Sequence, residues 1–390
     1  MSREVGDLRV LTEQLNSTNE SNHNLLQAIQ ERLKKRETTG VEPGCLRALY
    51  FNQIYSRKER VKPAHLETFQ WILDDEAIDD ALHDANQHKF RQWLRCLDAD
   101  KNVFWISGKP GSGKSTLMKF LVGHSKLQQQ ADEWIGARKV LVVDYFFWRP
   151  GTYLQRSLKG LLRSLIFQIL KERRDFIASA FPRHEWMISG DQYEFTQTEL
   201  LEALRKIIVL AQEEDFRILF FIDGLDEFDD RDDQSDIVPD ERELLDTLGI
   251  FSNSPAVKLC VSSRPWSAFQ KKFGQDVLRT FPIHELTKND IKKYIDEKLV
   301  DNPDFQSLDI GDVGRSSLVE ELLQAAQGVF LWVYFATRAL LDGIDREDRL
   351  WQLQDKIRKL PPKLKDLYSH ILSSIAPEYW PEVARALMVA

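Results

Sequence analysis

The residues most able to do chemistry form one glycine-rich run. The run consists of Gly108, Lys109, Pro110, Gly111, Ser112, Gly113, Lys114, Ser115 and Thr116, and it fits the pattern G-x-x-x-x-G-K-[ST]. Its glycines let the chain curl so that successive backbone N–H groups point at one oxyanion, and the positive end of a following helix strengthens that field. Lys114 is then placed to reach the β- and γ-phosphates, and Ser115 to ligate Mg²⁺. We therefore expect this run to bind a nucleotide.

An acidic motif later in the chain supplies candidate metal-binding and catalytic groups. Residues 217–227, R-I-L-F-F-I-D-G-L-D-E, read as a buried strand that ends at Asp223. An acid at the end of a parallel strand lies at the carboxyl edge of the sheet, beside the phosphate loop, where it can hold Mg²⁺ through water. Glu227, about one helical turn further, can orient and deprotonate a water, and Asp226 is the less favoured alternative. We assign the acidic residues from Asp229 to Asp236 to a solvated loop.

Two arginines follow strand-like segments. Arg264 ends the run V-S-S-R, at the same sheet edge, where a guanidinium can report on the γ-phosphate or stabilise its charge. The alternative for Arg264 is an ordinary surface ion pair. Arg149, in F-F-W-R-P-G, is assigned to the surface, with an approach to the phosphates as the weaker alternative.

The elements that must position these residues alternate between apolar and helix-like runs. We expect strands at Val103–Ser107, Lys139–Phe147, Arg217–Asp223, Val257–Ser263 and Thr280–Glu285. Helices are expected at Arg47–Arg60, Ala64–Ile72, Lys89–Cys96, Thr116–Val122, Gly151–Leu170, Thr198–Gln212 and Asp240–Phe251. This alternation is typical of a parallel sheet covered on both faces. Later patterns are helical only: Thr287–Leu299, opened by a Thr-x-x-Asp cap, Ser316–Leu341 and Pro362–Ser374.

Composition narrows the class of protein. A chain of 390 residues with 43% hydrophobic content can bury a sizeable core and holds two or three domains. A net charge of -8 argues against nucleic acid or an anionic membrane as the main partner. The 3 cysteines are widely separated and lack metal-site spacing, which favours a reducing compartment. No apolar run is long enough to span a membrane, so we expect a cytoplasmic protein.

The N-terminal segment, up to about residue 38, is polar and helix-prone. Its leucines and isoleucine fall on a loose seven-residue register: Leu8, Leu11, Leu15, Leu25 and Ile29. We favour an amphipathic helix that packs on its own chain, or the end of a missing upstream domain. A self-association helix is the alternative.

The ordered set G-K-P-G-S-G-K-S, F-I-D-G-L-D-E and V-S-S-R-P resembles the NACHT branch of the signal-transducing ATPases with numerous domains (STAND), particularly the large set from filamentous fungi. Flanking stretches are similar too: A-H-L-E-T-F-Q-W-I at 64–72, S-L-K-G-L-L-R-S-L-I-F-Q-I-L at 157–170, L-T-K-N-D-I-K-K-Y-I at 286–295, G-V-F-L-W-V at 328–333 and L-P-P-K-L-K-D-L-Y at 360–368. The resemblance covers roughly residues 46–390.

The resemblance implies a P-loop NTPase sheet with helices on both faces, preceded by helices and followed by a helical domain and the start of a winged helix. It implies domains at 1–40 (helical or coiled segment), 41–98 (helical lead-in), 99–286 (NACHT domain), 287–376 (helical domain) and 377–390 (truncated winged helix). The full pattern of the family also includes an effector domain upstream and a repeat sensor downstream, and neither is recognised in this sequence. We therefore expect a fragment or a truncated product.

The function that the resemblance implies is a nucleotide-dependent switch. ADP with Mg²⁺ holds a closed resting form, and ATP favours an open form that assembles into a homo-oligomer, as in fungal NOD-like immune or incompatibility receptors. GTP stays open as an alternative to ATP. We expect slow hydrolysis; a scaffold that binds nucleotide without turnover is the alternative from another class, and a kinase or mechanical ATPase is the rival among enzymes.

Overall fold

A computed structural model describes residues 44–65, 68–73, 81–136, 138–182, 193–231 and 241–373. The expected N-terminal helical segment, the acidic run near Asp236 and the expected winged-helix start at 377–390 lie outside these residues. Two compact units are distinguished. One comprises Ile166–Ile207 with the chain up to Phe51, and the other comprises Asn52–Leu165 with the chain from Ile208 onward.

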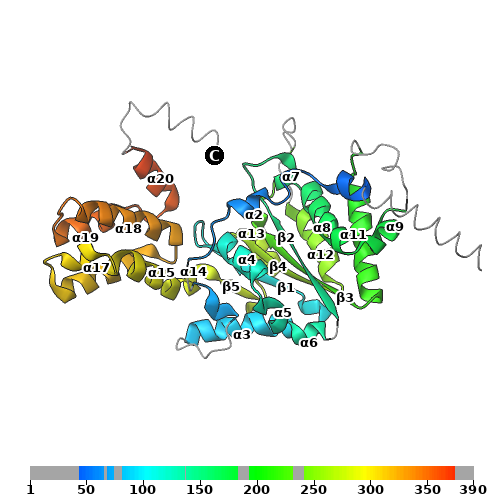
Figure 1. Cartoon of the computed structure of the whole chain (residues 1–390), viewed down its shortest axis with the longest axis horizontal. Coiled ribbons are helices and arrows are strands. Elements are labelled where there is room, and N and C mark those ends of the chain that lie inside the picture. Colours follow the sequence, from blue (N-terminus) through cyan, green and yellow to red (C-terminus); the bar gives the residue numbers. More distant parts are fainter. Residues whose placement is uncertain are drawn as a thin grey trace, which may run out of the picture. The chain divides into compact units, whose positions relative to one another are not determined.

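The second unit contains a parallel five-stranded sheet with the order β2-β3-β4-β1-β5 (Figure 1). The strands are β1 (Val103–Ser107), β2 (Lys139–Phe146), β3 (Phe216–Asp223), β4 (Val257–Ser263) and β5 (Thr280–Pro282). Ser107 pairs with Ser263, and Phe146 pairs with Asp223, so the central strands end at one edge. The predicted sheet is therefore confirmed, and four of its strands have bounds within one residue of those expected.

The fifth strand is shorter than expected. We predicted a strand over Thr280–Glu285, but β5 ends at Pro282 and a helix, α14 (Ile283–Leu286), follows. Proline has no N–H for a ladder hydrogen bond, and its fixed φ suits the residue before a helix. The helical turn brings Ile283 against the loop that follows β1, where a Cβ added to Gly108 would lie 2.6 Å from the Ile283 Cγ2 atom.

Side chains alternate along each strand, so every strand contributes to both faces of the sheet, and both faces are covered by helices. On one face, Phe104 and Cys260 join a core with Leu117 of α4 (Lys114–Gly123). On the other face, Phe220 packs against Phe251 of α12 (Glu241–Ser252), with ring centroids 6.3 Å apart. Helix α13 (Ser267–Phe273) lies on this second face as well, since its Phe273 contacts Trp105 of β1.

The remaining helices of the α/β region follow the expected runs only in part: the runs Lys89–Cys96, Gly151–Leu170 and Thr198–Gln212 contain helices, but three short helices over Lys126–Gln130, Asp132–Ile135 and Ile177–Ala180 were not predicted. They are α3 (Ala81–Arg95), α5 (Lys126–Gln130), α6 (Asp132–Ile135), α7 (Tyr153–Arg156), α8 (Leu158–Glu172), α9 (Ile177–Ala180) and α11 (Gln197–Glu213). Short 3-10 turns are η2 (Ala99–Lys101), η3 (Arg174–Phe176), η5 (Leu225–Glu227) and η6 (Val277–Arg279). The single helix predicted over Gly151–Leu170 breaks at Ser157, whose backbone is extended, with φ of -98° and ψ of 160°. After the break, Gly160 lies so close to Leu154 that a Cβ there would be 1.9 Å from the Leu154 carbonyl oxygen.

The lead-in is less helical than predicted. Residues 44–49 are helical, and α2 (Ser56–Arg60) follows a turn. The run expected as a helix over Ala64–Ile72 contains only the 3-10 turn η1 (Gln70–Ile72) among its described residues. Phe69 has a φ of 64°, in the left-handed region, and this conformation prevents a regular helix from running through residue 69.

The C-terminal part is helical, as expected, and is coloured yellow to red in Figure 1. Its elements are α15 (Lys288–Ile295), the π-helix η7 (Asp296–Val300), α16 (Pro303–Ser307), α17 (Gly311–Ala326), α18 (Phe330–Ile344), α19 (Leu350–Lys359) and α20 (Leu364–Ser373). The helix predicted over Ser316–Leu341 breaks at Gln327 and Gly328, which have φ of 48° and 76°. A Cβ at Gly328 would lie 1.7 Å from the His284 carbonyl oxygen, so only glycine fits.

The predicted Thr-x-x-Asp cap of α15 is wrong. The Thr287 side chain makes no cap and donates instead to the Gly328 carbonyl at 3.2 Å. The Asp290 carboxylate accepts the Phe69 backbone N–H at 3.3 Å and the Trp71 indole N–H at 3.2 Å. Partners distant in sequence thus displace the local cap. No helix within the described ranges is long and apolar enough to cross a membrane.

Candidate functional site

The glycine run forms the loop between β1 and α4. Gly111 and Gly113 have φ of 68° and 96°, a conformation that favours glycine. The Gly108 N–H donates to the Ser263 carbonyl at 3.3 Å, and a Cβ at Gly108 would lie 2.6 Å from Ser112 Oγ. The predicted loop is therefore held to the end of β4, with no room for larger residues at its base.

Two side chains inside this loop keep unused hydrogen-bonding capacity. Lys114 Nζ donates to the carbonyls of Gly108 at 2.9 Å and Lys109 at 3.1 Å, which leaves its third proton. Burial lowers the pKa of Lys114, while the charges of Asp226 and Asp223 act in the opposite direction. Ser112 Oγ is buried without a hydrogen-bond partner. A buried polar atom of this kind needs a partner, and a phosphate oxygen fits that need.

The outer side of the loop contacts the helical part. The Leu331 N–H, in the first turn of α18, donates to the Gly111 carbonyl at 3.1 Å. Lys109 Nζ donates to the Gln327 carbonyl at 3.3 Å. Pro110, between them, is exposed, and Thr116 is half-buried in the first turn of α4. The loop is thus joined by hydrogen bonds to the segment that begins α18.

Asp223 lies at the end of β3 beside the loop and is almost fully buried. Its Oδ1 accepts the Ser262 hydroxyl at 2.5 Å, and the same hydroxyl accepts the Gly224 N–H at 3.0 Å. Burial raises the pKa of Asp223, against which a side-chain hydrogen bond to Ser115 acts most strongly. The serine hydroxyl and the carboxylate are hard oxygen ligands side by side, as Mg²⁺ requires. The described residues contain no cluster of three or more His, Cys, Asp or Glu side chains suited to a metal ion.

The neighbouring carboxylates Asp226 and Glu227 have different partners. Asp226 Oδ1 accepts the Arg264 backbone N–H at 2.9 Å, and Asp226 Oδ2 lies 2.9 Å from Arg264 Nε. Glu227 Oε2 accepts only the backbone N–H of Arg149, at 3.2 Å, among the residues described. Burial raises the pKa of Glu227, and the charge of Arg57 opposes that rise. Asp226 is therefore committed to Arg264, whereas Glu227 keeps acceptor capacity for a water.

The start of the acidic loop is not solvated, so our assignment of Asp229 and Asp230 was wrong. Asp229 is 3% exposed, and its Oδ2 lies 2.5 Å from Arg231 Nη2 and 3.6 Å from Arg149 Nε. The Arg231 hydrogen bond lowers the pKa of Asp229. Asp230 accepts the Tyr153 hydroxyl at 3.2 Å. These partners hold the segment that follows Glu227 in place, as would not be expected of a solvated loop.

One cation near the site was missed by sequence reasoning. The charge of Arg57, on α2, acts on both Asp223 and Glu227. In the sequence Arg57 belongs to a short mixed-charge run, S-R-K-E-R, which reads as a solvated helix face. No motif spacing links this run to the loop, so only the folded chain brings them together.

Comparisons with known proteins agree with the motifs. The family described as "Nephrocystin 3, N-terminal" matches residues 67–264, a range that contains the loop, Asp223, Glu227 and Arg264. The vegetative incompatibility protein HET-E-1 of Podospora anserina is 22% identical over 375 residues, covering 92% of this chain and 24% of that protein. The chain thus spans about a quarter of that relative's length. The resemblance to NACHT proteins is confirmed by these matches.

Three solved structures are distantly similar. The ADP form of the Aeropyrum pernix ORC2 protein has a TM-score of 0.36 at 11% identity, covering 74% of this chain and 72% of that one. Cdc6p from Pyrobaculum aerophilum has a TM-score of 0.34 at 10% identity, covering 70% and 66%. PCH-2 of C. elegans has a TM-score of 0.32 at 12% identity, covering 73% and 70%.

Proposed function

Because the chain belongs to the nephrocystin 3 N-terminal family, we propose that it is the nucleotide-switch module of a NACHT-type signalling protein, binding ATP or ADP with Mg²⁺ and hydrolysing ATP slowly. One observation carries the proposal. Lys114, Ser115 and Asp223 converge at one sheet edge, with Glu227 beside them. Phosphate binding needs the lysine, magnesium binding needs the hydroxyl and carboxylate, and hydrolysis needs the second carboxylate.

The proposed binding step uses the loop and the end of β3. Backbone N–H groups between Gly111 and Thr116 surround the phosphates, and Lys114 neutralises the terminal ones. Ser115 and Asp223 hold Mg²⁺, whose other positions are filled by water and phosphate oxygens. The unpartnered Ser112 hydroxyl supports this arrangement, because it offers a further donor within the same loop.

The proposed hydrolytic step assigns the base to Glu227. A carboxylate with a raised pKa takes a proton from water more readily than one with an ordinary pKa. Asp226 is the weaker candidate, since Arg264 occupies both of its oxygens. Arg264 has 43% of its side chain exposed, so we keep it as a γ-phosphate sensor that exchanges Asp226 for phosphate.

The proposed switch couples phosphate number to the helical part through the loop. The hydrogen bonds from Leu331 to Gly111 and from Lys109 to Gln327 support this, because a change in loop shape must act on α18. We propose that residues 99–286 form the nucleotide domain and 287–376 the helical domain, with a homo-oligomer as the active form of the full-length protein. The likeness to a fungal incompatibility protein supports a role in fungal immune or incompatibility signalling.

The nucleotide that accompanies the purified chain tests the proposal. The 390-residue chain is purified without added ligand and denatured, and released nucleotides are separated by ion-exchange chromatography. ADP at close to one equivalent is expected, with little in the Lys114→Ala variant. A chain that carries no nucleotide, and binds neither fluorescent ADP nor fluorescent ATP at millimolar concentration, overturns it.

Turnover separates the switch from the non-hydrolysing scaffold. The switch predicts slow phosphate release that requires Mg²⁺ and is absent in Glu227→Gln. Bound nucleotide without any phosphate release would instead support the scaffold. If the site is specific for adenine, GTP should compete poorly with ATP. Equal competition would mean that both nucleotides are ligands.

A further inference from the structure

Helix α2 is fixed beside β2 by contacts of its first and third residues. Lys58 Nζ lies 2.5 Å from Asp144 Oδ2, and Asp144 lies on β2 with 8% exposure. Gln155 Nε2 donates to Ser56 Oγ at 2.8 Å. The chain just after α2 is held too, because Lys119 of α4 donates to the Val61 carbonyl. These contacts fix the position of α2 relative to α4, the helix that follows the phosphate loop.

Arg57, at the second position of α2, has no polar partner in the described part of the chain. Its Nε is buried without a hydrogen bond, and its guanidinium makes no ion pair with any residue described. The Trp148 ring lies near the guanidinium, with its centroid 6.0 Å from Arg57 Cζ. A part-buried guanidinium without an acceptor costs free energy, so a ligand that supplies acceptors would stabilise it.

The position of Arg57 indicates where such a ligand lies. Its charge acts on Asp223 and on Glu227, two of the carboxylates at the sheet edge. It nevertheless forms an ion pair with neither of them. Trp148, whose ring lies near the guanidinium, directly precedes Arg149, whose backbone N–H donates to Glu227 Oε2 at 3.2 Å. The guanidinium therefore lies near the segment that holds Glu227 without being paired to it.

We propose that Arg57 contacts the terminal phosphate of a bound nucleoside triphosphate, so that α2, which lies before the phosphate loop in sequence, distinguishes a triphosphate from a diphosphate. This inference rests on the nucleotide binding proposed above. A planar guanidinium with several N–H donors matches a terminal phosphate, which has three free oxygens. A diphosphate places no group there and leaves Arg57 as it is in the structure.

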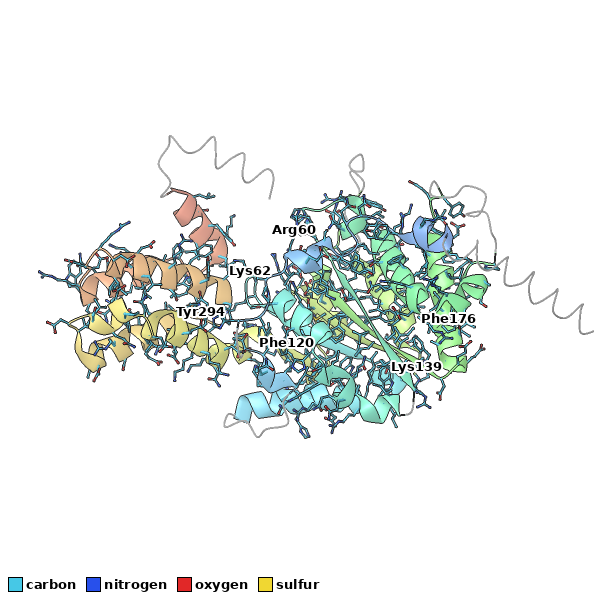
Figure 2. All side chains as sticks on the ribbon, viewed as in Figure 1. Arg60, Lys62, Phe120, Lys139, Phe176 and Tyr294 are labelled. Carbon is cyan, nitrogen blue, oxygen red and sulfur yellow. The ribbon has the colours of Figure 1, made fainter. Side chains whose placement is uncertain are left out.

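Arg60, on the same helix, provides a matched control (Figure 2). It is exposed, and its Cζ lies 4.7 Å from the centroid of the same Trp148 ring. Arg57 and Arg60 thus share the tryptophan, the helix and the charge. Arg57 differs from Arg60 in that its Nε is buried and its charge acts on Asp223 and Glu227.

The test measures dissociation constants for fluorescent ADP and for a slowly hydrolysed fluorescent ATP analogue. Arg57→Ala is expected to weaken the ATP analogue about tenfold or more and to change ADP by less than about twofold. Arg57→Lys, which keeps the charge but not the fork of donors, is expected to recover part of the loss. Arg60→Ala is expected to bind both nucleotides as the unmodified chain does.

A second measurement uses ADP with beryllium fluoride, which imitates the terminal phosphate. The unmodified chain and Arg60→Ala are expected to trap ADP in its presence, and Arg57→Ala is not. Equal losses for ADP and the ATP analogue, or no loss for either, overturn the role of Arg57 while leaving nucleotide binding intact. Failure of the unmodified chain to bind either nucleotide overturns the proposed function instead.

Discussion

The two ends of β4 both carry cationic residues, but in opposite settings. Near the amino end, Lys258 is fully buried, donates to the Trp93 carbonyl, and lies between the rings of Trp93 and Trp134 at 5.3 and 5.2 Å. At the carboxyl end, Arg264 pairs with Asp226 and remains 43% exposed. One cation is enclosed by the core of the protein, and the other can be reached from solvent.

This difference follows from the parallel sheet. Parallel strands begin at one edge and end at the other, and near the amino end of β4 Lys258 is covered by Trp93 of α3 and Trp134 of α6, whereas the loops with polar groups follow the carboxyl ends. Burial lowers the pKa of Lys258 to about 7, because the aromatic surroundings and one carbonyl replace water poorly. Changes at the carboxyl end should therefore alter nucleotide chemistry, and changes at the amino end should alter stability.

The largest effect is expected from Glu227→Gln. The substitution keeps the shape of the side chain but removes the proposed base, so ATP turnover should fall about a hundredfold or more. Affinity for ATP and the melting temperature should stay close to those of the unmodified chain. Phosphate release and fluorescent nucleotide binding measure the two quantities. If turnover persists in this variant and is lost in Asp226→Asn, the base is Asp226.

Lys114→Ala should weaken ATP binding about tenfold or more, a loss of at least about 1.4 kcal/mol. The ammonium is the loop's only side-chain cation held toward its interior, by the carbonyls of Gly108 and Lys109. Lys271→Ala, at an exposed position of α13, is the matched control. An ATP affinity within about threefold of the unmodified chain, with the fold intact, would show that the loop is not the binding site.

Lys258→Met should change the pH dependence of stability and leave nucleotide affinity unchanged. Burial lowers the pKa of Lys258 to about 7 in the folded protein, whereas an ordinary lysine, as in the unfolded chain, has a pKa of about 10.5. Between these values the unfolded chain binds a proton that the folded chain does not, so stability rises with pH.

Lys258 is expected to raise the free energy of unfolding by about 1 kcal/mol per pH unit between pH 7 and 8. The Lys258→Met variant should lose this slope. Urea unfolding at several pH values in this interval measures the slope. Lys139→Met, exposed at the amino end of β2 and labelled in Figure 2, should keep the slope of the unmodified chain. A weaker nucleotide affinity in Lys258→Met would contradict the division between the two ends of β4.

The smallest effect is expected from Arg264→Ala. We expect the ATP affinity to fall about threefold and the ADP affinity to stay nearly unchanged, because Arg264 must leave Asp226 to contact a phosphate. Isothermal titration with both nucleotides measures this difference. An equal loss for ATP and ADP would identify Arg264 as a structural ion pair and would leave Arg57 as the proposed sensor.

Sequence patterns predicted the sheet well because its strands are buried on both faces. The bounds of β1 and β4 match the prediction, since each apolar run is followed at once by polar or glycine residues. The same reasoning extended β5 into Glu285, because an alternating pattern cannot show that Pro282 stops pairing. The roles of Lys114, Ser115, Asp223, Glu227 and Arg264 remain predictions, although the structure brings these residues together.

Interactions between distant segments were beyond the reach of sequence reasoning. The cap expected at Thr287 fails because Asp290 is engaged by the backbone of Phe69, a residue far earlier in the chain. Arg57 was overlooked for the same reason, since charge patterns describe only near neighbours. The carboxylate of Asp229 is buried only because Arg149 and Arg231 reach it after folding.

The hydrogen bond between Leu331 and Gly111 consists of main-chain atoms alone. Any amino acid except proline, which lacks the N–H, can therefore donate this bond from position 331. Phe330 can become proline without loss of this bond, because the donor belongs to the next residue. Gly111 has no such freedom, since a Cβ there would lie 2.7 Å from Leu364 and its φ is 68°. The link between the helical part and the loop therefore depends on glycine at position 111 but not on which side chain stands at position 331.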